Sequence, residues 1–293
     1  MTWIFFTLFA AVMQSVRTAA QKRLSGQISA LGVTYARYVF GLPIAALYML
    51  LLQTDLPTAF AAPAQVWGVI LFGGIMQIIA TWALVSVFQW RNFAAGTTFA
   101  KTEALQTAVL GAVIGVPLAL GGWLSVLVGV LGIVALSYPA NFRSLRAWLT
   151  PATGLGLLSG FGFALSSLCI HASSKQLGLP PLQAASVVLV SMIVMQLVLM
   201  TLWFLWRDRA LFAALAQHWR WAAFIGLTSA LGSIGWFTAM SLQNPALVKT
   251  LGQVEFFVTL LITWRLFKES IGGKEWVGMT LILVSVVLLL YTA

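Results

Sequence analysis

Two stretches of the chain decide its fold: residues 92–107, NFAAGTTFAKTEALQT, and residues 244–259, NPALVKTLGQVEFFVT. They share an asparagine, an alanine, two threonines and a glutamate at identical spacing, which places Glu103 and Glu255 152 positions apart. Each glutamate lies within a long apolar segment, and an ionised carboxylate at membrane depth is costly and usually kept for function. The repetition predicts an internally duplicated membrane protein whose centre lies where the two copies meet.

The composition around these stretches is that of a membrane protein. The 293 residues are 61% hydrophobic and 8% charged, and the mean hydropathy is +0.98. A soluble domain carries charges on about a quarter of its residues. Uncharged runs such as 104–142 and 176–206 exceed the roughly 20 residues that one membrane-crossing helix needs. We therefore expect an all-α, polytopic membrane protein embedded in a lipid bilayer.

Prolines, glycines and charged residues at predicted turns divide the chain into ten transmembrane helices. The predicted spans are residues 2–21, 31–52, 66–88, 93–115, 119–138, 151–172, 182–206, 219–240, 245–267 and 273–292.

A linker over residues 139–150 separates a first five-helix repeat, residues 1–138, from a second, residues 151–293. At an offset of 153, Lys22 pairs with Lys175 and Trp123 pairs with Trp276, which extends the duplication beyond the glutamates. An odd number of helices per repeat inserts the second copy upside down. We therefore predict two inverted five-helix repeats, the plan of many secondary transporters.

Lysine and arginine set the expected orientation, because they concentrate on the cytoplasmic side of membrane proteins. Thirteen basic residues lie in or beside the connections after spans one, three, five, seven and nine, against Lys175 on the opposite side. Both termini are therefore expected outside the cytoplasm, in a bacterial inner membrane. The thirteen are Arg17, Lys22, Arg23, Arg37, Arg91, Arg143, Arg146, Arg207, Arg209, Arg220, Arg265, Lys268 and Lys274.

The candidate site residues on helices four and nine are charged or polar. In a continuous helix, Lys101 and Glu103 lie ~200° apart, at ~100° per residue, and are expected on opposite faces. The same division predicts Lys249 and Gln253 on one face of helix nine and Glu255 on the other. The glutamates are interpreted as proton-coupling groups or partners of a substrate ammonium, with the lysines meeting a carboxylate. The alternative is that they form structural ion pairs.

Other candidates come from four further helices, and each has two interpretations. Gln14 and Arg17 share a face of helix one, where Arg17 is either a clamp for a substrate carboxylate or a head-group contact. His171 is either a proton relay or an interfacial histidine. Trp82 and Trp236 either wall a cavity for apolar, aromatic or cationic substrates or pack against helices and lipid.

Several function classes find no support in the sequence. It contains no Walker loop, no GxSxG and no cluster of histidines and cysteines. We therefore expect no enzyme, no cofactor and no metal. The basic residues are scattered singly, so they do not indicate nucleic-acid binding, and the arginine at position 37 is interpreted as a membrane-surface anchor.

The duplicated mid-helix glutamates, Arg37-Tyr-Val-Phe-Gly41, and Phe267-Lys268-Glu269 followed by Gly278 resemble the EamA-type drug/metabolite transporter superfamily. The chain departs from the family pattern where Ala104 and Phe256 follow the glutamates, because proline is common there. Family members also commonly keep both termini in the cytoplasm, unlike the charge pattern of this chain. The resemblance implies gradient-driven export or exchange of small metabolites.

The function expected from these observations is secondary active transport of amino-acid-like or drug-like amphipathic compounds by alternating access. Export coupled to or exchanged against protons is the most concrete form, by a monomer or a homodimer. One alternative is facilitated exchange of an anionic metabolite through Lys101, Lys249 and Arg17. Another is an integral-membrane lipid-handling protein, either a flippase or an enzyme, and a third is a receptor or assembly subunit.

Overall fold

The computed structural model describes residues 1–88, 99–137, 150–258 and 273–292, and within these ranges the regular structure is helical, without strands. Six of the described helices are long and apolar enough to cross a membrane. They are α1 (Thr2–Leu24), α2 (Ala30–Leu51), α4 (Ala64–Val87), α8 (Pro151–Gln176), α9 (Pro181–Arg207) and α11 (Trp219–Leu242).

The remaining described helices are shorter. Four of them fall within the other predicted spans: α6 (Glu103–Val113), α7 (Leu120–Ser137), α12 (Pro245–Gly252) and α14 (Gly273–Thr292). Each of the ten predicted spans therefore overlaps a helix of the structure, and the arrangement of ten membrane-crossing helices stays a prediction. Two further short helices, α3 (Leu56–Phe60) and α10 (Ala210–Gln217), lie in connections that the sequence predicted as turns. The predicted linker falls mostly on residues outside the described ranges.

Local sequence signals explain where several helices begin. The Ser29 side chain accepts a hydrogen bond from the Gly32 amide at the start of α2, and Thr150 does the same for Thr153 before α8. Asn244 caps α12 by accepting from the Ala246 amide. Such side chains satisfy backbone donors that a helix start leaves free. Proline follows Thr150 and Asn244 at the first helical position, where it needs no hydrogen-bond partner.

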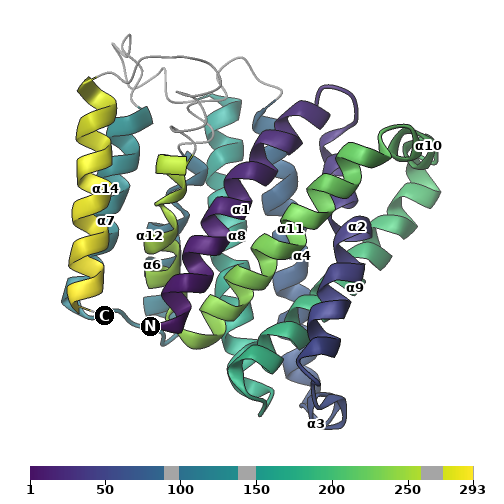
Figure 1. Ribbon diagram of the computed structural model, residues 1–293, viewed down its shortest axis with the longest axis horizontal. Coiled ribbons are helices and arrows are strands. Elements are labelled where there is room, and N and C mark those ends of the chain that lie inside the picture. Colours follow the sequence, from purple (N-terminus) through teal and green to yellow (C-terminus); the bar gives the residue numbers. More distant parts are fainter. Residues whose placement is uncertain (89–98, 138–149, 259–272, 293) are drawn as a thin grey trace.

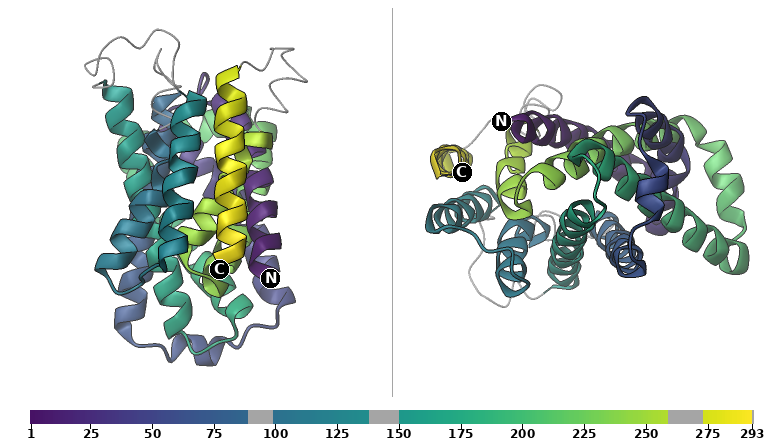
Figure 2. Two further views of the ribbon diagram at one scale, coloured as in Figure 1. Left: turned by 90° about the vertical axis from the view of Figure 1, so that its left-hand side faces the viewer. Right: turned by 90° about the horizontal axis from the view of Figure 1, so that it is seen from below.

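Three helices of the first half contact the helix that has the same place in the chain order of the second half. The pairs α2 with α9, α6 with α12 and α7 with α14 are in contact, and Figure 2 shows α7 and α14 together at one end of the molecule. In addition, α4 packs against α8 as α11 packs against α1. A two-fold relation between the halves would produce this pattern, and the relation itself stays a prediction.

The two short helices lie at opposite ends of the bundle. Figure 1 shows α3 at the lower end, the end that also holds both termini, and α10 at the upper end. Each follows the second long helix of its half, so the two are matched in chain order. Their opposite placement is the arrangement expected if the second half is inserted upside down.

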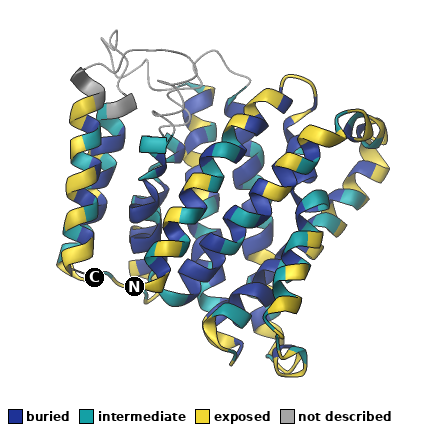
Figure 3. Ribbon diagram, in the orientation of Figure 1, coloured by how far each residue is buried: buried dark blue, intermediate teal, exposed yellow. Residues whose placement is uncertain are grey.

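Apolar side chains cover the outward faces of the bundle. Figure 3 shows exposed residues along the outer sides of the helices and buried residues where the helices face one another. Leu127 and Leu131 of α7 and Val287 and Leu290 of α14 are exposed. In water such surfaces would drive association, whereas in a bilayer they face lipid tails. The burial pattern therefore fits a membrane-embedded, multi-pass protein.

Small residues permit the closest helix contacts. A Cβ atom placed on Gly162 of α8 would come within 2.9 Å of the Met76 carbonyl oxygen on α4. Packing at this distance is typical of membrane helices, where glycine lets backbones approach closely. The contact fixes α8 against α4, and both helices contribute residues to the cavity described below.

Candidate functional site

Two ion pairs cross between the two halves of the chain. Lys101 of the first half binds Glu255 of the second, while Lys249 of the second half binds Glu103 of the first, with Nζ and Oε1 2.5 Å apart. Glu103 and Glu255 are 8% and 7% exposed. Buried charges of this kind need a partner, and here each carboxylate has its partner in the opposite half of the chain. The pairs therefore tie the two halves together.

Each glutamate follows an interruption in its helix. Residues 99 and 100 are helical, Lys101 and Thr102 form a turn, and α6 begins at Glu103. In the second half α12 ends at Gly252, Gln253 and Val254 form the turn, and helix resumes at Glu255. Both carboxylates thus lie in the first turn of a new helical segment, where the backbone amides favour negative charge.

This interruption corrects the prediction that Lys101 and Glu103 lie on opposite faces. That prediction assumed one continuous helix, but the turn changes the relation between successive side chains. Lys101 and Glu103 both line a cavity between the halves, and Glu255 lines the same cavity. Discontinuous helices at matching positions of two repeats are a known setting for binding sites at the membrane midplane.

Helix α1 completes the surroundings of Glu255. The Gln14 amide Nε2 donates to Glu255 Oε2 at 2.8 Å, and the Ser15 hydroxyl donates to the Glu255 carbonyl oxygen at 3.2 Å. Gln14 Oε1 in turn accepts from Trp236 Nε1 at 3.0 Å. One glutamine therefore connects the carboxylate to the aromatic residue of α11, so that α1, α11 and the segment after α12 are held together.

Two small cavities adjoin at the ion pairs, with volumes of about 30 and 20 Å³. A water molecule needs roughly 10–15 Å³ of such space, so each cavity has room for very few waters. The residues common to both cavities are Gln14, Glu103, Trp236 and Lys249. The Lys249–Glu103 pair therefore lies in the wall between the two cavities.

Arg17 and Arg37 line the larger cavity. Each is 4% exposed. The prediction that Arg37 is a surface anchor is therefore wrong. For Arg17, the burial excludes the interpretation as a head-group contact. The Arg37 Nη1 group donates to the Thr81 hydroxyl at 2.6 Å. Among the described residues, Arg17 Nε has no hydrogen-bond partner. Both arginines were counted as topology signals, so eleven of the thirteen remain for that purpose.

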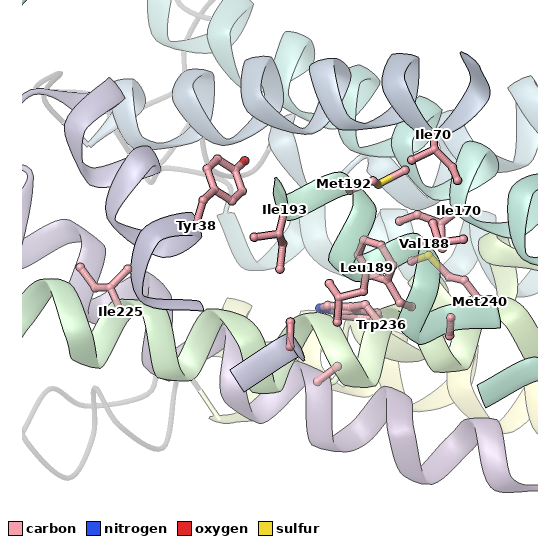
Figure 4. Packing of buried hydrophobic residues seen from close by; sticks show 14 of the residues in the cluster. Tyr38, Ile70, Ile170, Val188, Leu189, Met192, Ile193, Ile225, Trp236 and Met240 are labelled. Atoms are coloured by element: carbon pink, nitrogen blue, oxygen red, sulfur yellow. The ribbon is translucent and has the colours of Figure 1, made fainter. Parts of the chain in front are cut away.

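An aromatic wall surrounds the Lys249 ammonium. Its Nζ lies 4.5 Å from the ring centre of Trp236 and 5.8 Å from that of Phe163, distances at which a ring face attracts a cation. Figure 4 shows Trp236 among buried side chains of α8, α9 and α11, including Ile170 and Leu189. Trp236 thus lines the cavity, which agrees with the first of its two interpretations, that of a cavity wall.

Two predicted site residues lie apart from the cavities. Trp82 is half-buried and packs against the core, and it lines neither cavity. The His171 Nδ1–H donates to the Met240 carbonyl oxygen at 2.6 Å, which fixes the ring against α11, and His171 also lines neither cavity. Of the other candidates, Gln253 lines the smaller cavity, and both atoms of its buried amide lack a hydrogen-bond partner among the described residues.

Sequence reasoning missed several polar residues that line the larger cavity. Gln77 of α4, Ser166 and Ser167 of α8 and Ser233 of α11 all face it. Gln77 could have been found, because a glutamine in the middle of an otherwise apolar span carries the same signal as the glutamates. The serines could not, since a serine within a membrane helix often bonds to its own backbone, as Ser167 does to the Phe163 carbonyl oxygen.

Two comparisons with known proteins bear on the fold and the function of this chain. Residues 150–291 match the EamA-like transporter family, and no curated protein matches the chain. A solved structure titled "Crystal structure of protein" superposes with a TM-score of 0.76 and 15% identity, covering 100% of this chain and 97% of the other. At that identity the likeness shows the fold alone. Residues 150–291, just under half of the chain, therefore match the EamA-like transporter family, and this match suggests membrane transport of small molecules.

Proposed function

We propose that the protein is a secondary transporter that exports small amphipathic metabolites by alternating access, in exchange for protons. The observation that carries this proposal is the pair of crossed ion pairs, Lys101–Glu255 and Lys249–Glu103, between the two halves. They lie near matching helix interruptions; both pairs border the smaller cavity, and the Lys249–Glu103 pair borders the larger one as well. Charges inside a membrane are rare and mark substrate or ion pathways.

The cavities support alternating access because neither can hold a metabolite as it stands. With volumes of about 30 and 20 Å³, they are far below the 300 Å³ or so of an ordinary ligand pocket. In this proposal the arrangement represents a state of the cycle in which the substrate space between the halves is collapsed. Opening the space between the halves requires the crossed pairs to separate, since each pair joins one half to the other.

Protonation is the step that separates them. A proton bound to Glu103 or Glu255 neutralises the carboxylate, and the lysine facing it loses the opposite charge that held it. The pair then contributes far less attraction between the halves. Proton binding on one side of the membrane would thus favour opening, and proton release on the other side would re-form the pair.

The proposal is tested in liposomes that contain the purified protein, an imposed pH gradient and a pH-sensitive dye. Amino acids and organic acids are added in turn, and dissipation of the gradient is recorded. We expect wild-type protein to dissipate the gradient with at least one compound. Glu103→Gln and Glu255→Gln should abolish this flux, because each removes the titrating group at nearly constant volume. Asp208→Asn, a change at an exposed acid, should leave the flux unchanged.

Two results would contradict proton exchange. One is a wild-type protein that transports a compound without moving protons. The other is undiminished proton flux in both single variants and in the double variant. In the second case the crossed pairs would be structural, and the lysines would become the leading candidates for the site.

The orientation proposed here follows the basic residues, with both termini outside the cytoplasm. Removing Arg17 and Arg37 from the count leaves eleven, still a large excess over Lys175 alone. Alkaline phosphatase fused after Ala293 should then be active, and a fluorescent protein at the same place should stay dark. An inactive phosphatase with a bright fluorescent fusion would show the opposite orientation.

A further inference from the structure

The charges around the cavities do not balance. The described lining residues include Arg17, Arg37, Lys101 and Lys249, against the carboxylates of Glu103 and Glu255. Four cationic side chains against two carboxylates leave an excess of two positive charges. Both carboxylates already bind a lysine, so the excess falls on the arginines.

Among the described residues neither arginine forms an ion pair, and Glu103, whose charge favours the Arg17 guanidinium, already binds Lys249. Both line the larger cavity and are 4% exposed, and Arg37 donates a hydrogen bond to the neutral hydroxyl of Thr81. Arg17 Nε has no acceptor among the described residues, and the two guanidinium groups repel each other. A buried cation without a partner is expensive, so this part of the cavity favours an anion.

We propose that Arg17 and Arg37 form an oxyanion subsite, which makes the substrate a small organic anion carrying a carboxylate or a phosphate. The inference rests on the proposed transport function and names its substrate class. A guanidinium presents its donors in a fork that matches both groups. The aromatic rings of Phe163 and Trp236 line the same cavity and would contact the apolar part of the anion.

The excess charge also ranks related compounds. A net anion lowers the positive excess of the cavity, whereas a zwitterion brings an ammonium group that restores it. Anions should therefore bind more tightly than amino acids of the same skeleton. Neutral amides, which cannot supply an oxyanion, should not bind.

Four compounds with one phenyl ring test this ranking: phenylacetate, phenylacetamide, phenylalanine and phenyl phosphate. Each is added to purified full-length protein at constant chloride, and the unfolding midpoint is followed by circular dichroism. Binding to the folded state raises the midpoint. We expect a rise of at least about 2 °C with phenylacetate, phenyl phosphate or both, a smaller rise with phenylalanine, and none with phenylacetamide. The two anions distinguish a carboxylate from a phosphate.

Variants assign the effect to the arginines. Arg17→Gln and Arg37→Gln should abolish the anion-dependent rise, and Arg17→Lys, which keeps the charge without the fork, should reduce it. Arg207→Gln, at an exposed position, should retain it in full. The ligand-free midpoint of Arg17→Gln should not fall, which separates loss of binding from loss of folding.

The subsite is wrong if phenylacetamide raises the midpoint as much as phenylacetate, if neither anion does, or if Arg17→Gln responds like wild type. Because no pH gradient is present, the result is independent of proton coupling. Failure of the oxyanion subsite would leave the liposome result standing, and failure of proton exchange would leave the binding result standing.

Discussion

Each half of the chain contributes one glutamate to the cavities, whereas both arginines come from the first half. Glu103 and Glu255 occupy equivalent positions 152 residues apart, and each follows a turn that interrupts its helix. Arg17 and Arg37 have no such counterparts, because Ile170 and Val190 stand at the offset of 153. Ile170 lines the same cavity as Arg17, so the position matched by sequence offset to this cationic residue is aliphatic.

The difference separates two tasks that one cavity must perform. Residues that separate and re-form their contacts on each side of the membrane are needed in both halves, and the crossed ion pairs meet this requirement. An element that recognises one end of a substrate needs only one copy. The duplicated residues therefore fit the conformational change, and the unduplicated arginines fit substrate selection.

The largest expected effect contrasts a paired cation with an unpaired one. Lys249→Met leaves Glu103 buried without its partner and should lower the free energy of unfolding by about 3–5 kcal/mol. Arg17→Met removes a buried cation that forms no ion pair among the described residues and should cost nothing or raise stability. Thermal or denaturant unfolding in the same detergent measures both variants.

A matched second substitution checks the reason for the loss. Adding Glu103→Gln to Lys249→Met should recover part of the stability, because the stranded charge is then removed. If Lys249→Met is neutral and Arg17→Met is strongly destabilising, the contrast between the paired and unpaired cations is reversed and the account of both fails.

A smaller effect is expected at the aromatic wall, where Trp236 lines both cavities and Trp82, 154 positions earlier, lines neither. A Cβ atom on Gly252 would lie 2.3 Å from Trp236 Cη2. Gly252→Ala should therefore displace the indole and cost about 1–3 kcal/mol of stability, together with a change in tryptophan fluorescence.

Gly68→Ala is the control, since a Cβ atom there meets nothing within 4 Å. It should be neutral or stabilise by up to about 1 kcal/mol, as alanine favours a helix over glycine. Equal losses in the two variants would mean that Gly252 is needed for its backbone and not for the room it leaves to Trp236.

The smallest expected effect concerns Gln14, whose counterpart at the same offset is Ser167. Gln14→Leu removes the bonds to Glu255 and Trp236 and should cost about 1–2 kcal/mol. Gln176→Leu, at an exposed residue near the end of α8, should change stability by less than about 0.5 kcal/mol. A Gln14→Leu variant as stable as wild type would show that the network contributes little.

The sequence predicted the location of the six long apolar helices because long uncharged runs and turn residues are strong local signals. It could not predict the interruptions at Lys101 and Gln253, since neither turn contains glycine or proline at its centre. That failure led directly to the wrong assignment of Lys101 and Glu103 to opposite faces. Arg37 was misplaced for a related reason: an arginine near a helix end resembles a surface anchor unless the packing around it is known.

The glutamates were identified from the sequence alone, but their partners were not. Pairing depends on how α6 and α12 face each other, and no local pattern encodes that contact. The family motif Phe267-Lys268-Glu269 lies outside the described residues, so its role in the resemblance stays a prediction. Residues of a repeat are thus easier to find than the contacts between repeats.

A double-mutant cycle on stability tests the central claim that each glutamate binds the lysine of the opposite half. The cycles combine Lys101→Met with Glu255→Gln, Lys249→Met with Glu103→Gln, and, within one half, Lys101→Met with Glu103→Gln. The account predicts coupling energies of about 2–3 kcal/mol for the two crossed pairs and less than about 1 kcal/mol within the half. Strong coupling within the half and none across it would contradict the crossed arrangement, and with it the link between protonation and separation of the halves.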